Sequence, residues 1–217
     1  SYYLTKPVNP SQILMACKKV LDTKQISSDK LIKDFLDFIK KIQTKNYNNL
    51  DINDWKILFH ELCEWSLKID EINNVDFKKI LEDEKDIINN NFSKYIPEIY
   101  KYWLDNKDDR PILSSDIFSK CLKPIIDNKK LIFIIIDCFR LDQWKQISSL
   151  FKDNYEIKED IHVSILPTAT PFARNSIFSG LMPLELKNNY NELWKKMFLE
   201  KKYNGYEDEL FENILNE

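Results

Sequence analysis

The sequence predicts a chain of mixed class in three parts. Residues 1–25 form a short strand–helix piece, residues 26–128 an all-helical bundle, and residues 129–217 the start of an α/β domain with a parallel sheet. Three observations support this division. Prolines cluster near the start, a long stretch then carries apolar residues at helical spacing, and short continuous apolar runs follow after residue 130.

The first part opens on the β-type run "YYL", which the breaker cluster "KPVNP" follows. Asn9 can cap a helix. Pro10 would then occupy the first helical position, where the backbone N–H that proline lacks would have no partner within the helix in any case. The apolar residues of this helix are Ile13, Leu14, Cys17, Val20 and Leu21.

The middle part is dominated by helical periodicity. Asn53 or Asp54 is the expected cap of its second helix, and Pro97 is expected to kink or split the third, which runs from Phe77 toward Leu104. The first two apolar stripes comprise Leu31, Phe35, Phe38, Ile39 and Ile42, and then Trp55, Leu58, Leu62, Trp65 and Ile69. A shorter helical pattern follows, with Ile117, Leu122 and Ile125.

The last part alternates strand and helix patterns. "LIFIII" (residues 131–136) is a continuous apolar run, typical of a strand buried on both faces, and "IHVSIL" (residues 161–166) is a second candidate strand. Helical patterns follow each of them, and Gly180 is expected to close the helix "PFARNSIFSGL". A further helix, "YNELWKKMFLEKKY", comes next. This alternation predicts an α/β unit with a parallel sheet.

Composition excludes several classes of protein. The net charge of −3 gives no global basic field for nucleic-acid binding, and the longest apolar run is too short to span a bilayer. The chain opens on neither an initiator Met nor a signal-peptide pattern, so we expect a cytoplasmic piece of a longer protein and no membrane insertion. No cysteines lie at a metal-binding spacing, which predicts free thiols at Cys17, Cys63, Cys121 and Cys138.

Candidate chemistry lies at the ends of the two predicted strands. Asp137 directly follows the first strand, and the turn with Thr168 and Thr170 directly follows the second. If the strands are neighbours, a carboxylate and a hydroxyl meet at one edge of the sheet, at a helix N-terminus that favours an anionic group such as phosphate. Both could then bind one metal ion, which would activate the hydroxyl as a nucleophile. Alternatively, these side chains only cap the helices that follow them.

The stretch "PTATPFARNSIFSGLMP" (residues 167–183) resembles the nucleophile turn of the alkaline phosphatase superfamily, most closely its nucleotide phosphodiesterase and PglZ branches. The resemblance implies that Thr170 is the nucleophile and a zinc ligand, that Asp137 is a ligand of the same metal, and that Thr168 supports the turn. "IDCFRLDQW" is similar to the Asp-x-x-Arg-x-Asp form of PglZ domains. This second similarity implies a supporting role for Arg140 and Asp142.

The stretch "YYLTKPVNPSQILMACKKVL" (residues 2–21) resembles the last strand and helix of a response-regulator receiver domain. The resemblance implies that Lys6 contacts a phosphorylated aspartate, that Pro7 follows a cis peptide, and that Tyr3 changes rotamer on activation. It also implies a cognate histidine kinase, a homodimer formed on phosphorylation, and magnesium at an acidic receiver site that lies upstream of this chain.

The three parts in this order resemble a family of response regulators linked to type nine secretion. The resemblance implies a longer protein that hydrolyses oligonucleotide phosphodiesters with zinc. Because the remaining zinc ligands of the family would lie downstream, the chain alone is expected to be inactive. Two alternatives remain open, namely a non-catalytic module that binds a sigma factor or a secretion component, and a different superfamily enzyme of the sulfatase or mutase type.

Overall fold

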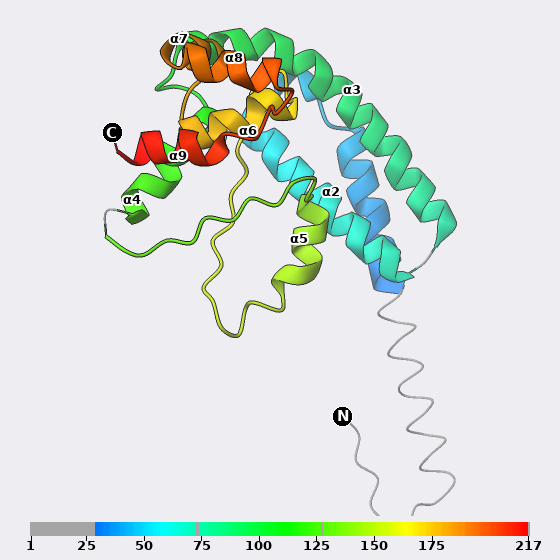
Figure 1. The fold of residues 1–217 in the computed structure, drawn as a ribbon. Helices are drawn as coiled ribbons and strands as arrows, with labels where there is room; N and C mark the ends of the chain where they lie inside the picture. Colours follow the sequence, from blue (N-terminus) through cyan, green and yellow to red (C-terminus); the bar gives the residue numbers. More distant parts are fainter. Residues whose placement is uncertain (1–28, 73, 127, 217) are drawn as a thin grey trace, which may run out of the picture. The chain divides into compact units, whose positions relative to one another are not determined.

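The computed structural model describes residues 29–72, 74–126 and 128–216 and divides into two compact units (Figure 1). The described part of unit 1 runs to Glu98 and includes Arg140–Asp153. Unit 2 comprises Ile99–Phe139 and Asn154–Glu217. The predicted receiver residues Tyr3, Lys6 and Pro7 lie outside the described residues.

Unit 1 is built from helices, as the periodicity predicts. Residues 29–43 are helical, and the short η1 (Tyr47–Asn49), α2 (Ile52–Ile72) and the first part of α3 (Val75–Asp105) follow. A later helix, α5 (Leu141–Ser148), belongs to the same unit and packs against α2. No described helix has both the length and the apolar character that a bilayer span requires.

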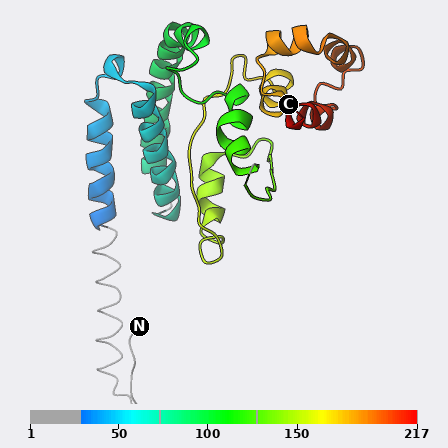
Figure 2. The same cartoon turned by 90° about the vertical axis from the view of Figure 1, so that its left-hand side faces the viewer.

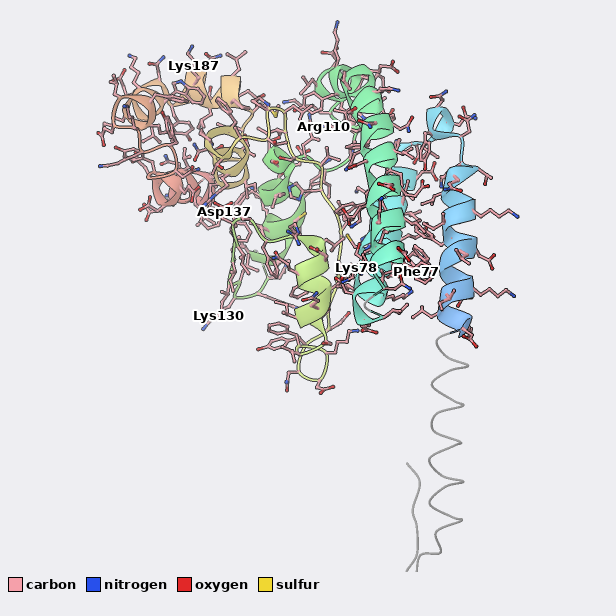
Figure 3. The ribbon with its side chains drawn as sticks, turned by 90° about the vertical axis from the view of Figure 1, so that its right-hand side faces the viewer. Phe77, Lys78, Arg110, Lys130, Asp137 and Lys187 are labelled. Carbon is pink, nitrogen blue, oxygen red and sulfur yellow. The ribbon has the colours of Figure 1, made fainter. Side chains whose placement is uncertain are left out.

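The core of unit 1 is aromatic and aliphatic. The ring of Phe35 lies 5.5 Å from that of Trp65 and 5.2 Å from that of Phe77, which Figure 3 shows on α3. These rings bring three helices into one cluster. The predicted stripes are confirmed, since the buried side chains include Phe35, Phe38, Ile39, Ile42, Trp55, Leu58, Leu62, Trp65 and Ile69.

The N-terminus of α2 is capped by Asp51, two or three residues earlier than predicted. Its Oδ1 atom accepts the backbone N–H groups of Asn53 and Asp54, at 2.8 and 2.9 Å. Asp54 in turn accepts the N–H of Asp51, so each residue satisfies a donor of the other. The expectation of Asn53 or Asp54 as the cap was therefore wrong, because both residues already lie inside the helix.

Pro97 does not split α3, which is continuous from Val75 to Asp105. A proline inside a helix removes one backbone hydrogen bond and crowds the preceding turn, so it marks a weak point of the helix. The boundary between the two compact units falls beside this position, between Glu98 and Ile99.

Unit 2 contains the remaining helices (Figure 2). The short η2 (Ser114–Asp116), η3 (Phe118–Leu122) and α4 (Lys123–Ile126) precede α6 (Thr170–Ser179), α7 (Pro183–Asn189), α8 (Asn191–Leu199) and α9 (Glu207–Leu215). Helix α6 packs against both α9 and η2. A small core of Leu186, Leu193, Met197 and Leu210 joins the last three helices.

The predicted parallel sheet is not formed by the described residues. Within them, strand-like pairing is limited to one parallel bridge between Leu113 and Val163, where the N–H of Val163 donates to the carbonyl of Ile112 at 2.8 Å. A strand needs a hydrogen-bonded partner along its length, and the described residues give the two candidate segments no more than this bridge.

The segment at residues 131–136 nevertheless keeps the period of two that an extended chain has. Leu131, Phe133 and Ile135 are half-buried, whereas Ile132, Ile134 and Ile136 are 85, 71 and 58 % exposed. The ring of Phe133 contacts those of Phe178 and Phe211. The prediction of burial on both faces was therefore wrong for the described residues, which cover one face only.

Candidate active site

Thr170 is the first residue of α6, which begins one residue before the predicted start at Pro171. Ala169 is the residue that precedes the helix, Pro171 occupies the second helical position, and no side-chain hydrogen bond caps the N-terminus. Gly180 ends the helix with a left-handed φ of 67°, as expected. Because Thr168 and Thr170 are both exposed and neither caps α6, the capping alternative does not explain these threonines.

Asp137 lies at the end of the extended segment, with its carboxylate fixed on both oxygens. Oδ1 accepts the backbone N–H of Cys138 at 3.0 Å, and Oδ2 lies 3.2 Å from Nη1 of Arg174. Cys138 has a φ of 57°, which is uncommon for a residue with a side chain. The sharp turn after Asp137 thus brings its carboxylate toward α6.

Arg174 links Asp137 to the helix that carries Thr170. Its Nη2 atom donates to Glu207 Oε2 at 2.5 Å, so one guanidinium contacts two carboxylates. Burial disfavours the charged form, but the hydrogen bond and negative charge of Glu207, aided by Asp137, raise the pKa of Arg174 above its ordinary value. Arg174 therefore stays charged at neutral pH.

Two asparagines tie the first turn of α6 to the loop before α9. Asn175 is almost fully buried, and its Nδ2 atom donates to the carbonyls of Pro171 and Tyr203, both at 2.8 Å. Nδ2 of Asn204 lies 2.8 Å from Glu207 Oε1 and 3.4 Å from the carbonyl of Thr170. These bonds satisfy polar groups that would otherwise be costly to bury.

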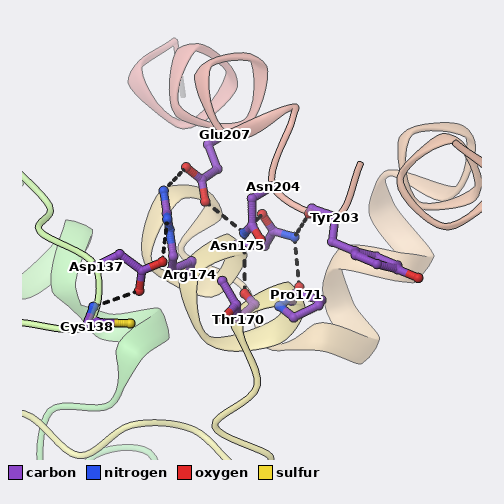
Figure 4. Close-up of polar contacts among 9 residues, drawn as sticks. All are labelled: Asp137, Cys138, Thr170, Pro171, Arg174, Asn175, Tyr203, Asn204 and Glu207. Carbon is purple, nitrogen blue, oxygen red and sulfur yellow. Dashed lines mark hydrogen bonds and ion pairs between the residues drawn. The ribbon is translucent and has the colours of Figure 1, made fainter. Parts of the chain in front are cut away.

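One hydrogen-bonded network therefore links the Asp137 carboxylate to the backbone carbonyl of Thr170 (Figure 4). Its connecting residues are Arg174, Glu207 and Asn204, none of which was predicted from the sequence. One signal for Arg174 was available, since residues four apart lie on the same face of a helix and Arg174 follows Thr170 by four positions. Nothing in the local sequence points to Glu207, which lies 33 positions further along.

Arg140 and Asp142 pair with each other at the start of α5, in unit 1. The guanidinium of Arg140 donates to both carboxylate oxygens of Asp142, at 3.0 and 2.8 Å. The hydrogen bond from Arg140 lowers the pKa of Asp142 below its ordinary value. This pair stabilises the beginning of α5, and Asp137 belongs to the other unit.

The donors in this network do not make a complete zinc site. A zinc site in a protein has four ligands, of which at least three are protein side chains. Asp137 and Thr170 supply two oxygen donors, and Arg174 already engages the carboxylate. Among the residues that the structure describes, no group of three or more His, Cys, Asp or Glu side chains could hold a metal ion.

Comparison with protein families matches two parts of the chain. Residues 25–104 match the PorX response regulator linker domain, and residues 117–213 match the BREX system PglZ alkaline phosphatase-like domain. The chain is PorX-like, with a PglZ-type effector domain. The comparison with curated proteins found no match.

The two family matches cover different, non-overlapping parts of the PorX-like chain. The helical bundle of unit 1 carries the linker match, and the network around Arg174 lies within the PglZ match. Helix α5 is part of the PglZ match by sequence, yet it packs on α2 of the linker. The described residues within the PglZ match form helices joined by irregular segments, and they form no sheet.

Proposed function

We propose that this chain is part of a response regulator whose phosphatase-like domain hydrolyses phosphodiester bonds, with oligonucleotides as the substrate class. In this proposal a cognate histidine kinase phosphorylates the receiver domain, and phosphorylation promotes a homodimer. The linker and PglZ matches support this order of modules. The nucleophile is the hydroxyl of Thr170, and Lys6 would contact the phosphorylated aspartate.

The proposal that this chain belongs to an enzyme rests on the exposure and the lack of a capping bond of the Thr170 side chain. It is exposed at the first residue of α6, it does not cap the helix, and the backbone around it is fixed by Asn175 and Asn204. A nucleophile needs an accessible oxygen on a rigid backbone, beside groups that bind an anion. A helix N-terminus offers such groups to a phosphoryl oxygen.

In the proposed reaction, Thr170 Oγ1 attacks phosphorus, and its bond to phosphorus forms as the P–O bond to one alcohol of the diester breaks. That alcohol leaves with the proton that the Thr170 hydroxyl gives up. Water then hydrolyses the phosphodiester on Thr170, which releases a phosphate monoester and restores the hydroxyl. We also propose that the full-length protein binds zinc through Asp137 and Thr170, with further ligands outside the described residues, and magnesium at the receiver site. Bound zinc would supply Lewis-acid assistance to the attack.

The test uses the full-length protein and three variants, with bis(p-nitrophenyl) phosphate and a short oligonucleotide as substrates. Thr170→Ala removes the attacking oxygen and should lower turnover by several powers of ten. Thr168→Ala should have a much smaller effect, and Asp137→Asn should lower bound zinc and turnover together. Full activity of Thr170→Ala, or loss of activity in Thr168→Ala alone, would contradict the proposed nucleophile.

A non-catalytic interaction module that binds a sigma factor or a secretion component is the second candidate. The ion pair between Asp137 and Arg174, which gives this carboxylate a structural partner, favours it. It predicts that the unmutated full-length protein binds no zinc and cleaves neither substrate. The same measurements therefore separate the two candidates.

A further inference from the structure

We infer that Arg174 and Glu207 are positioning residues of the proposed site: Glu207 orients the guanidinium of Arg174, which holds the Asp137 carboxylate close to the first turn of α6. This inference rests on the proposed function, because it assigns both side chains to that site. Neither side chain was a candidate at the level of sequence, and neither is proposed to touch the substrate.

The carboxylate of Glu207 is held in place by burial and by two hydrogen bonds. Its side chain is 13 % exposed, and each carboxylate oxygen accepts a hydrogen bond, from Arg174 Nη2 and from Asn204 Nδ2. It is also the first residue of α9, where a negative charge is stabilised by the N-terminal end of the helix dipole. A carboxylate held in this way offers a single orientation to its partner.

Arg174 transmits this orientation to Asp137. The guanidinium is planar, so fixing Nη2 on Glu207 also fixes the direction of Nη1 toward Asp137. Asp137 is 56 % exposed and follows a segment that has neither helix nor ladder, so its own backbone restrains it weakly. The contacts with Arg174 and with the backbone N–H of Cys138 therefore set where the carboxylate points, and Arg174 is the side chain among them.

Asn204 connects the same pair to the proposed nucleophile. Its amide contacts Glu207 and the carbonyl of Thr170, while Arg174 belongs to the same helix face as Thr170. Asn204 thus keeps the Glu207 carboxylate in place relative to the first turn of α6, so that Glu207 can orient Arg174. Since catalysis needs reacting groups held to within a fraction of an ångström, the expected effect of displacing Glu207 is on turnover rather than on substrate binding.

The first experiment observes the network directly in the 217-residue chain. The chain has three arginines, so side-chain N–H signals in a nitrogen-15 NMR spectrum can be assigned by substitution. Arg174→Lys identifies the Arg174 signal. We expect Glu207→Gln and Asp137→Asn to shift or broaden that signal, and Glu212→Gln, a change on the exposed face of the same helix, to leave it in place. An Arg174 signal insensitive to Glu207→Gln would overturn the inference.

The second experiment measures kcat and KM of the full-length protein with bis(p-nitrophenyl) phosphate. Glu207→Gln should lower kcat by about 10- to 100-fold, the range typical of residues that orient a ligand, and leave KM unchanged. Arg174→Lys should retain more activity than Arg174→Met, because an ammonium can still reach a carboxylate. The double variant Glu207→Gln/Arg174→Met should be no slower than Arg174→Met alone, since Glu207 acts through Arg174.

The outcomes separate this inference from the proposed function. If Thr170→Ala is inactive while Glu207→Gln has full kcat, or if the two losses in the double variant add, the positioning role is wrong and the proposed nucleophile stands. If the unmutated protein has no turnover, or if Thr170→Ala keeps it, both proposals fall together. A merely structural role of Glu207 would be seen as equal losses of folded protein in Glu207→Gln and Arg174→Lys, with kcat per folded molecule unchanged.

Discussion

Gly180 lies directly against Ile214, so that a Cβ atom placed on Gly180 would be 2.5 Å from Cδ1 of Ile214. The glycine also has a φ of 67°, in the left-handed region where other residues are strained. Gly180→Ala should therefore destabilise the chain by at least about 1–2 kcal/mol, which urea denaturation followed by circular dichroism can measure. Since the end of the Ile214 side chain can move, we expect the backbone to account for most of this loss.

Gly205 provides the matched control for that substitution. An added Cβ there would meet Lys202 Cβ at 3.1 Å, and Gly205 has no positive φ. Gly205→Ala should change the free energy of unfolding by less than Gly180→Ala does. Equal losses in the two variants would show that the left-handed backbone at Gly180 is not the cause.

Arg110 and Asp116 form a buried ion pair in unit 2. The two side chains are 3 and 13 % exposed, and Nη2 lies 2.7 Å from Oδ1. Arg110→Met would leave the Asp116 carboxylate without its partner and should destabilise the chain by about 3–5 kcal/mol. Lys107→Met, which breaks an exposed pair with Glu185, should cost less than about 1 kcal/mol in the same denaturation experiment.

Thr170→Ala should barely change the stability of the folded chain. The Thr170 side chain does not cap α6, so its removal breaks no capping bond. We expect a change in unfolding free energy within about 0.5 kcal/mol, the range of ordinary surface substitutions. A loss of about 1 kcal/mol or more would indicate a capping role instead. Asn175→Ala, which removes two buried hydrogen bonds, should be clearly destabilising under the same conditions.

The ion pair between Arg140 and Asp142 should make a pH-dependent contribution to stability. The hydrogen bond from Arg140 lowers the pKa of Asp142 in the folded chain, so the stabilisation is complete above the ordinary pKa of 3.8 and is lost as the pH falls through the lower folded value. Asp142→Asn should therefore destabilise the chain at pH 6, by less than about 1 kcal/mol for so exposed a pair, and the difference should vanish in strong acid. Urea denaturation of both proteins at several pH values measures the difference in unfolding free energy at pH 6 and in strong acid.

The helical bundle was predictable because its information is local. Apolar residues three and four apart identify the buried face of each helix, and Trp55, Leu58 and Trp65 are buried as expected. The residues that cap the helix ends were harder to predict from the sequence. Asp51 caps α2 because its carboxylate reaches two N–H groups, a choice between neighbouring polar residues that composition alone does not decide.

The strands were less predictable because a strand depends on partners distant in sequence. The apolar run ending at Ile136 has the alternation of an extended chain, but its pairing is decided by segments far along the chain. The same limit applies to the site. Thr170 and Asp137 follow from their positions after candidate strands, whereas Glu207 enters the network only through the folded contact with Arg174.

Helix α5 has a practical consequence for dividing this protein into domains. Its sequence falls within the PglZ match, but it covers part of α2, where Cys63 is 8 % exposed. Burial, together with the negative charge of Asp142 on α5, raises the pKa of the Cys63 thiol, and a thiol with a raised pKa reacts slowly. Cys63 is thus a natural reporter. A linker expressed without α5 should become open to thiol-reactive dyes at this position. In the intact chain, the rate at which Cys63 is labelled would measure how often α5 leaves the bundle.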